Sequence, residues 1–311
     1  MNPDSVTLYN QIISGCGLWP QPDHARLWAT GRDRIDLIHR MSTNDLMDMA
    51  VYEGRATALT TALARMVDRI VVINLGAQAL ILGSAGTGET IRRWLSGYIF
   101  FSDDVKFAVA DELGQFTLFG PQAQAVAESL APGASALKSY HIIEREGMIV
   151  GRGEALIESS FFVVAERDRL AGLHAAAVAA GAAEVDRAVY EVARIESGLP
   201  EYGYEIGEAY IPLEAGLWGE VSFSKGCYIG QEIIARMESR GKLAKTLVGI
   251  RAAGPLAAGT LFSGGVVTSA AESPRFGWIG LAFVKPAEAS AGTHLEAGGV
   301  TVTVAPLPFR G

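Results

Sequence analysis

The sequence predicts an α+β protein that ends in a small all-β domain. Up to about residue 240, strand-like runs mix with segments of helical periodicity, and after Gly241 only short strand-like runs separated by Gly, Pro and Ser remain. Of the 311 residues, 49% are apolar and 19% are charged, a composition typical of globular proteins. A chain of this length divides into about two or three domains. Strands and helices mixed in this way favour α+β sheets over one doubly wound sheet.

The first segments alternate between the two periodicities. Residues 25–45, "ARLWATGRDRIDLIHRMSTND", predict a strand, a turn at Thr30-Gly31 and an amphipathic helix whose apolar positions recur near every 3.6 residues. The runs "RIVVIN", "ALILGS" and "VKFAVAD" predict strands, and "ETIRRWLSGYIFF" predicts a helix between the last two.

The next segments continue the mixture as far as residue 240. "QFTLFGPQAQAVAESLA" predicts a strand, a Gly-Pro turn and a helix, and "RLAGLHAAAVAAGAAEV" predicts an Ala-rich helix that stops at a glycine. "DRAVYEVARIESGLP" predicts a helix that ends near Gly198, and "GQEIIARMES" predicts one that begins near Gly230. The turn-rich residues 241–311 predict a small closed β-barrel or sandwich.

Charge and leader signals narrow the class of protein. The net charge of −8 is spread without long runs of one sign, so we expect no stable nucleic-acid binding. The start "MNPDSVTLYN" has no secretory pattern, and two distant cysteines suit a reducing cytoplasm. The uncharged window 70–88 contains glycines, an Asn and a Gln, which favours a hairpin in a soluble sheet over a membrane helix.

Two motif-like patterns do not predict ligand sites. Gly83 to Thr90, "GSAGTGET", has the spacing of a phosphate loop, but Glu89 stands where the loop needs a lysine, so we expect only a strand–turn–helix corner. His141 and Glu144 in "HIIE" could share one face of a helix, but two ligands are too few for zinc. We therefore expect no metal site.

Cys227, in "KGCYIGQEI", is the strongest chemical candidate. It lies just before the predicted helix at Gly230 and close to Lys225, and both the helix end and the ammonium favour a thiolate. Flanking glycine lets a backbone approach a ligand closely. The alternative is a small buried hydrophobe, the usual fate of a lone cysteine, and the residues alone leave both open.

Glu196 is the second candidate. It lies in the last turn of its predicted helix, where the helix dipole disfavours an anion. Its carboxylate could accept hydrogen bonds from a ligand's N–H groups, or it could pair with Arg194 or another basic neighbour.

Several segments together resemble a known family. "KGCYIGQE" resembles the signature of the YgfZ family of folate-binding proteins, relatives of the glycine-cleavage aminomethyltransferase (T-protein). "WATGRDRIDLIHRMSTND", "FTLFGPQA", "RIESGLPEYGYEI" and "IPLEAGLWGEVSFSKGCYIGQE" resemble further blocks of that superfamily, and "GGVVTSAAESPRFGWIGLAFVK" with a late "PF" resembles its C-terminal barrel. The likeness covers nearly the whole chain.

The resemblance implies a three-domain, clover-like arrangement around a central folate cavity. It divides the chain into residues 1–240, made of two interleaved α+β subdomains (1–50 with 140–240, and a ferredoxin-like 51–139), and a C-terminal barrel, 241–311. It implies tetrahydrofolate or a one-carbon derivative as cofactor, with Glu196 accepting pterin N–H groups and Lys225 meeting the acidic tail at the opposite end. The other implied folate-contacting residues are Tyr202, Gly226 and Gln231.

One departure from the T-protein pattern concerns catalysis. Ile91 stands where T-proteins carry a catalytic aspartate, and Glu89 is two residues out of register, so aminomethyl transfer would lack its usual acid–base group. The resemblance therefore implies support of iron–sulfur cluster assembly or repair and of linked tRNA modification. It makes Cys227 the reactive residue and iron–sulfur client or assembly proteins the partners. The alternatives are a folate-dependent aminomethyl- or methyltransferase and a non-catalytic folate-gated scaffold.

Overall fold

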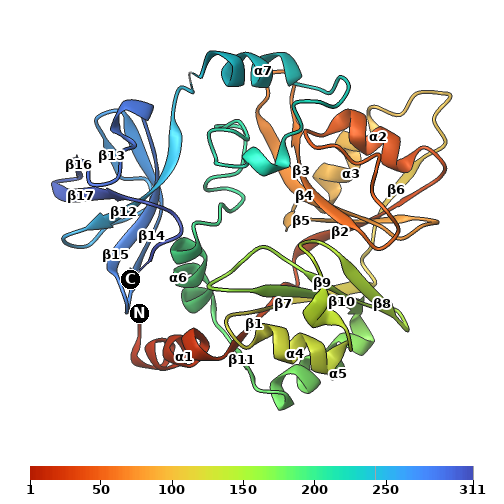
Figure 1. Cartoon of the computed structure of the whole chain (residues 1–311), viewed down its shortest axis with the longest axis horizontal. Helices are drawn as coiled ribbons and strands as arrows, with labels where there is room; N and C mark the ends of the chain where they lie inside the picture. Colours follow the sequence, from red (N-terminus) through yellow and green to blue (C-terminus); the bar gives the residue numbers. More distant parts are fainter. Residues whose placement is uncertain (242, 311) are drawn as a thin grey trace.

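The computed structural model describes residues 1–241 and 243–310 and shows three lobes, each built on its own β-sheet. Two lobes are α+β and lie one above the other in Figure 1, and the C-terminal barrel lies beside them. The predicted α+β fold with a C-terminal barrel is confirmed. In the part of the chain that is described, no helix is long and apolar enough to cross a membrane.

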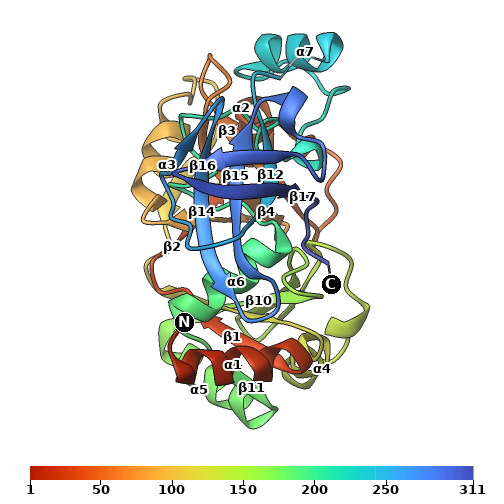
Figure 2. The same cartoon turned by 90° about the vertical axis from the view of Figure 1, so that its left-hand side faces the viewer.

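The first lobe has a six-stranded sheet whose strands come from distant parts of the chain. Its order is β11-β1-β7-β10-β9-β8, and β1 pairs parallel with β11 while the other pairs are antiparallel. Four helices pack on this lobe (Figures 1 and 2). Its elements are α1 (Pro3–Ser14), β1 (Cys16–Pro20), β7 (Leu113–Phe119), α4 (Ala123–Leu130), β8 (Ile142–Arg145), β9 (Met148–Arg152), β10 (Ser160–Glu166), α5 (Arg167–Ala179), β11 (Ala182–Glu184) and α6 (Arg187–Ser197).

The second lobe has a five-stranded antiparallel sheet in the order β3-β4-β5-β2-β6. Its apolar residues alternate along the strands and pack against two helices, as a sheet with one covered face requires. The uncharged window 70–88 forms most of the β4–β5 hairpin, as predicted. Its elements are β2 (His24–Thr30), α2 (Arg34–Met41), β3 (Gly54–Thr60), β4 (Met66–Asn74), β5 (Ala79–Ala85), α3 (Gly88–Ser96) and β6 (Lys106–Val109).

The C-terminal lobe is a closed six-stranded antiparallel barrel in the order β12-β15-β14-β13-β16-β17. Helix α7 (Gln231–Arg240) runs along the top of Figure 1 between the second lobe and this barrel. The strands are β12 (Thr246–Ala252), β13 (Leu261–Phe262), β14 (Gly265–Ser273), β15 (Gly277–Val284), β16 (His294–Ala297) and β17 (Val300–Ala305). Short 3-10 turns occur at Ala134–Ala136, Trp218–Glu220 and Pro286–Glu288.

Strand pairing divides the first 240 residues differently from the predicted subdomain boundaries. Strand β2 and helix α2, predicted with the first subdomain, belong to the second lobe: β2 pairs with β5 and β6, and α2 packs in the core of that lobe. Strand β7, predicted with residues 51–139, lies in the first sheet between β1 and β10. Both strands have apolar faces that either sheet could bury, so only non-local pairing decides where they lie.

The "HIIE" segment is a strand and not a helix. His141 precedes β8 and Glu144 lies within it, so the two residues do not share the face of a helix. The described residues hold no group of three or more His, Cys, Asp or Glu placed to bind a metal ion.

Helix α6 carries the candidate residue Glu196, and its two ends are both fixed by local chemistry. Asp186 caps the N-terminus by accepting a hydrogen bond from Val189 N. Gly198 ends the helix in the left-handed conformation, with φ +71°, and its N–H returns to the last turn. Glu196 is thereby held in the last turn, as predicted.

Candidate functional site

The Glu196 carboxylate is buried where α6 meets α1 and the barrel. Its side chain is 4% exposed, and Oε1 accepts hydrogen bonds from the Tyr9 hydroxyl at 2.7 Å and the Ser273 hydroxyl at 2.5 Å. Arg275, at 4.0 Å from Oε2, is the cation nearest to it among the described ion pairs. Burial raises the pKa of Glu196, and the two hydroxyls and Arg275 oppose that rise. Arg194, the alternative partner considered above, pairs instead with other glutamates.

Glu196 lines a cavity of about 490 Å³ between the first lobe and the end of the chain. Because Oε1 already accepts two hydroxyls, Oε2 is the oxygen with more acceptor capacity for a ligand. Arg275 and Arg310 supply positive charge to the same walls, and Phe309 supplies an aromatic surface. The full lining is Glu154, Ala155, Ile157, Glu196, Ser197, Leu199, Arg275, Pro308, Phe309 and Arg310.

A second cavity, of about 240 Å³, lies between the two α+β lobes and shares Glu154 and Leu199 with the first. On its wall, Arg69 of β4 pairs with Glu154 at 2.7 Å and donates to Tyr140 Oη at 2.9 Å. Arg69 Nε also donates to Glu220 Oε1 at 2.7 Å. Arg69 is therefore a fixed cation between two carboxylates, of which Glu154 lines the cavity, and the shared residues place the two cavities side by side.

The second cavity also contains a histidine that is held neutral. Burial lowers the pKa of His24 to about 4. The geometry agrees: Gln115 and Thr117 both donate to Gln21 Oε1, which turns the Gln21 amide nitrogen toward His24 Nε2 at 3.1 Å. A donor at that distance needs an unprotonated ring nitrogen.

Tyr202 and Glu196 line different cavities. Tyr202 is 37% exposed and lies on the wall of the 240 Å³ cavity, within a turn that bridges to Ile206. The 490 Å³ cavity is lined by Glu196 and not by Tyr202. The two predicted folate contacts are connected only through the walls that the cavities share.

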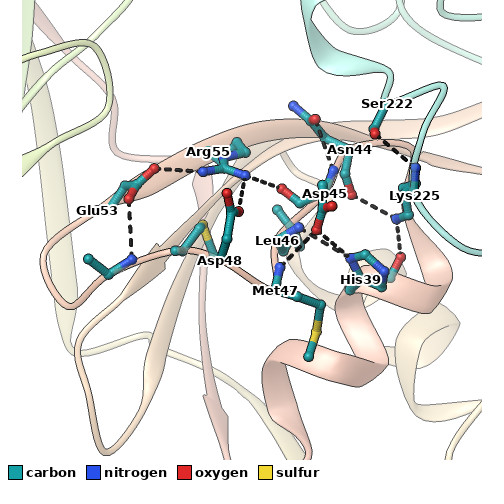
Figure 3. A network of polar contacts seen from close by, with 12 residues as sticks. His39, Asn44, Asp45, Leu46, Met47, Asp48, Glu53, Arg55, Ser222 and Lys225 are labelled. Atoms are coloured by element: carbon teal, nitrogen blue, oxygen red, sulfur yellow. Dashed lines mark hydrogen bonds and ion pairs between the residues drawn. The ribbon is translucent and has the colours of Figure 1, made fainter.

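Lys225 is fixed at the C-terminal end of α2 (Figure 3). Its Nζ donates to the backbone oxygens of His39 at 2.5 Å, Ser42 at 2.8 Å and Asn44 at 2.7 Å; His39 and Asn44 are labelled beside it in Figure 3. The residue is 8% exposed, and burial lowers its pKa to about 8. An ammonium has three donors, so this group is fully satisfied by the protein.

The other predicted residues of the KGC segment lie at the surface. Cys227 is an exposed free cysteine, Gly226 is exposed with open space around its Cα, and Gln231 is the partly exposed first residue of α7. Neither of the two cavities is lined by any of them or by Lys225. The predicted convergence of Glu196 and Lys225 on one cavity is thus not what the described residues show, because three backbone oxygens at and just after the end of α2 hold the ammonium elsewhere.

The Gly83–Thr90 loop is a strand–turn–helix corner between β5 and α3, as predicted. Asp68, a residue that sequence reasoning missed, accepts hydrogen bonds from Ser84 N, Ser84 Oγ and Thr87 Oγ1. A carboxylate thus accepts the hydrogen bonds of these loop donors. Ile91 is fully buried in the core of the second lobe and faces neither cavity.

Sequence reasoning also missed the cavity residues Arg69 and Glu154. The available signal was a charged pair, "DR", interrupting the apolar strand "MVDRIVVIN", where a buried charge needs a partner. Nothing local identified Glu154 as that partner.

Comparisons with known proteins agree with this architecture. A chloroplastic transferase-like protein of Arabidopsis thaliana is 25% identical over 297 residues, covering 91% of this chain and 69% of its own length. The aminomethyltransferase of Rubrobacter xylanophilus is 29% identical over 323 residues, covering 97% and 85%. The crystal structure of glycine cleavage system aminomethyltransferase T from Bartonella henselae superposes with a TM-score of 0.89 at 19% identity, covering 98% of this chain and 89% of that one. Residues 9–225 match the family described as "GCVT N-terminal domain", and this chain is a member of that family.

Proposed function

We propose that this chain binds tetrahydrofolate or a one-carbon derivative and supports iron–sulfur cluster assembly or repair and the linked tRNA modification. It would do so as a YgfZ-type member of its family, and not as a glycine-cleavage enzyme. The observation that carries the folate part is the buried Glu196 carboxylate on the wall of a 490 Å³ cavity that also holds two arginines.

The chemistry of this cavity matches the two ends of a folate. A pterin presents an N3–H and a 2-amino group, and a buried carboxylate with a spare oxygen accepts such donors strongly. Folate glutamyl carboxylates need cations, which Arg275 and Arg310 supply on the same walls. The adjoining 240 Å³ cavity, with Tyr202 and Tyr140 on its walls, offers further aromatic surface to a bound ring. The assignment of Lys225 to the folate tail stays a prediction without support from its position.

The buried Ile91 argues against aminomethyl transfer. A general acid or base must reach the reacting nitrogen, and an apolar side chain in the core can neither give nor take a proton. The similarity of this chain to aminomethyltransferases nevertheless supports one alternative function. A folate-dependent aminomethyl- or methyltransferase with a different acid predicts turnover of a methylated or aminomethylated donor with consumption of tetrahydrofolate.

Cys227 carries the iron–sulfur part of the proposal. An exposed thiol before the N-terminus of α7 is accessible to a partner's sulfur or cluster, which a buried thiol is not. Iron–sulfur client or assembly proteins would be those partners. If Cys227 has no chemical role, the chain is a folate-gated scaffold.

Calorimetric titration with tetrahydrofolate tests the folate part. Glu196→Gln keeps the size of the side chain and an oxygen for Tyr9 and Ser273, but removes the charge; we expect at least about a tenfold loss of affinity. Glu214→Gln is the matched control. Glu214 is also buried, with its pKa raised by burial, and it lines neither cavity. Equal affinities for wild type and Glu196→Gln would overturn the folate site.

Genetic complementation tests the iron–sulfur part. In a strain that lacks its own homologue, Cys227→Ala should fold and bind folate but fail to restore activity of iron–sulfur enzymes. Full restoration by Cys227→Ala, with folate binding intact, would instead support the scaffold.

A further inference from the structure

The residues around Lys225 form a built polar site that the folate proposal does not use. Helix α2 ends at Met41, and the next residues turn so that three backbone oxygens point to one place. The last carbonyls of a helix have no partners within the helix and carry its partial negative charge. Lys225, far away along the chain, donates to all three, and Figure 3 shows it beside His39 and Asn44.

The surrounding contacts tie the whole 219–225 segment to the same turn. Ser222 N donates to Thr43 O at 2.9 Å, and Thr43 Oγ1 donates to the Glu220 backbone oxygen at 2.6 Å. Asn44 Nδ2 donates weakly to Gly219 O at 3.4 Å. Within the segment, Lys225 N donates to Ser222 Oγ at 3.2 Å. Lys225 thus makes the last of these contacts before the chain reaches Cys227, and it makes them with a charged group.

The charged groups nearby leave Lys225 without a carboxylate partner among its described contacts. Asp45 is close enough to raise the pKa of Lys225, but its oxygen lies 3.3 Å from His39 Nδ1, and no ion pair joins it to Lys225 among the described residues. His39 does not compete for Asp45 as a cation, because Leu46 N donates to His39 Nδ1 at 3.2 Å, which requires that nitrogen to be unprotonated. Burial first, and the Lys225 charge second, lower the pKa of His39 in agreement with this geometry. The ammonium is held by backbone carbonyls.

We infer that Lys225 is a positioning residue: its ammonium binds one carbonyl of the last turn of α2 and two backbone oxygens just after the helix, and so fixes the loop that presents Cys227. The inference rests on the proposed role of Cys227 for its functional meaning, but the anchoring itself is independent of folate. It replaces the expectation that this lysine contacts the folate tail. Beyond Lys225 the chain runs through the exposed Gly226 and Cys227 to the buried Tyr228, whose ring lies 5.1 Å from the Lys225 ammonium.

Hydrogen exchange of wild type and Lys225→Met tests the anchor. Losing the ammonium leaves three carbonyls without their donor, so amides in residues 219–226 should exchange at least about tenfold faster, while barrel peptides keep their rates. Lys245→Met is the matched control, since that lysine lies 4.4 Å over the Tyr210 ring and makes no carbonyl cage in the described residues. Unchanged exchange in 219–226 would overturn the inference. Faster exchange everywhere would also count against it, because it would indicate general destabilisation.

Chemical rescue separates an anchor from a merely structural side chain. In Lys225→Ala, added methylammonium can donate to the three carbonyls and should restore protection of residues 219–226. Tetramethylammonium has the same charge but no N–H donor and should not. Rescue by both ions, or by neither, would contradict the hydrogen-bonded anchor.

A spectroscopic readout tests the same geometry in the wild type. A lysine ammonium whose three protons are hydrogen-bonded and buried should give a slowly exchanging ¹H–¹⁵N signal that disappears in Lys225→Met. Absence of such a signal in the wild type would argue against the anchor.

Tetrahydrofolate titration of Lys225→Met distinguishes this inference from the proposed function. A loss of affinity as large as that of Glu196→Gln, with residues 219–226 still protected, would return Lys225 to the folate site and overturn the anchor. If wild type binds no folate, the proposed function fails, and the exchange and rescue experiments still decide on the anchor.

Discussion

Glu196 and Lys225 are both buried charged residues near helix ends, yet they have opposite relations to their surroundings. Glu196 lies against the dipole of its helix, has one oxygen occupied by hydroxyls, and faces a cavity with the other partly free. Lys225 lies with the dipole of α2, and all its donors are used by the protein. The comparison teaches that unused hydrogen-bonding capacity, and not burial or charge alone, distinguishes a ligand group from a structural one.

The largest effect on stability should come from the region around Glu196, at Arg194, which lies on the same helix. Arg194 is 1% exposed and donates to the fully buried Glu205 at 3.1 Å and to Ser269 of the barrel at 2.6 Å. Arg194→Met leaves the Glu205 charge buried without its partner, so we expect a loss of about 3–5 kcal/mol in the free energy of unfolding. Urea denaturation measures it. Arg187→Met, which removes a half-exposed arginine with two glutamate partners, should cost only about 1 kcal/mol or less. Equal costs would show that α6 does not depend on the buried ion pair.

In the region around Lys225, stability should depend most on Gly230, the residue that caps the start of α7. Gly230 has φ +86°, and an added Cβ would lie 2.8 Å from Thr61 O and 2.9 Å from Ala64 Cα. Gly230→Ala therefore combines backbone strain with a clash against backbone atoms, and we expect a loss of about 2–4 kcal/mol in thermal or urea unfolding. Gly226→Ala, where nothing lies within 4 Å of the added Cβ, should stay within about 0.5 kcal/mol of wild type. A neutral Gly230→Ala would mean that the KGC loop is not seated on the β3–β4 turn as described.

The dependence of stability on pH tests the neutral state of His24 on the wall of the 240 Å³ cavity. The pKa of His24 is lowered to about 4, so between that value and its unfolded pKa, near 6.5, the unfolded chain binds more protons than the folded one. Stability from the neutral His24 is present above about pH 6.5 and is lost as the pH falls toward 4. His24→Gln should not lose this part of its stability on acidification. Because the His24 side chain is partly exposed, we expect the difference in the free energy of unfolding to be about 2 kcal/mol at most.

The readout for His24 is the difference between two curves. The free energy of unfolding in urea is measured for wild type and His24→Gln at pH 7, 6, 5 and 4. The advantage of wild type over the variant should shrink on acidification, or reverse in favour of the variant. Carboxyls whose pKa values are raised by burial, such as Glu196 and Glu220, act with the opposite sign but are common to both proteins. A constant gap would show that His24 is not held neutral.

The smallest effect on stability should come from the exposed thiol. Cys227→Ala removes an exposed side chain and should change the free energy of unfolding by less than about 0.5 kcal/mol. Cys16→Ala removes a thiol that is 2% exposed in the core of the first lobe and should cost about 1 kcal/mol or more. Alkylation adds a kinetic contrast: Cys227 should label under native conditions, and Cys16 only after unfolding. Slow native labelling of Cys227 would show that its loop is covered.

Local patterns were enough to find most elements and both chemical candidates. Periodicity located the helices that carry Glu196 and follow Cys227, and the glycines at positions 198 and 230 marked their ends because both take the left-handed conformation. The same local reasoning left open a helix at "HIIE", which is a strand, since a short apolar pair does not distinguish a strand from a helix. Partners could not be found in this way: neither Glu154 for Arg69 nor the backbone oxygens at the end of α2 for Lys225 are near in sequence.

The amino-acid sequence by itself determined the α+β class, the turn-rich barrel, the position of Glu196 in a last helical turn and the glycine-flanked cysteine, because each depends on residues within a few positions. Only the tertiary structure decided that β2 joins the second sheet and that Glu196 faces a cavity with two arginines. It also decided that the Lys225 ammonium donates to backbone oxygens at the end of α2. The physical reason is that strand pairing, burial and hydrogen-bond satisfaction are settled between segments far apart in the chain, where many partners are chemically acceptable and packing selects one.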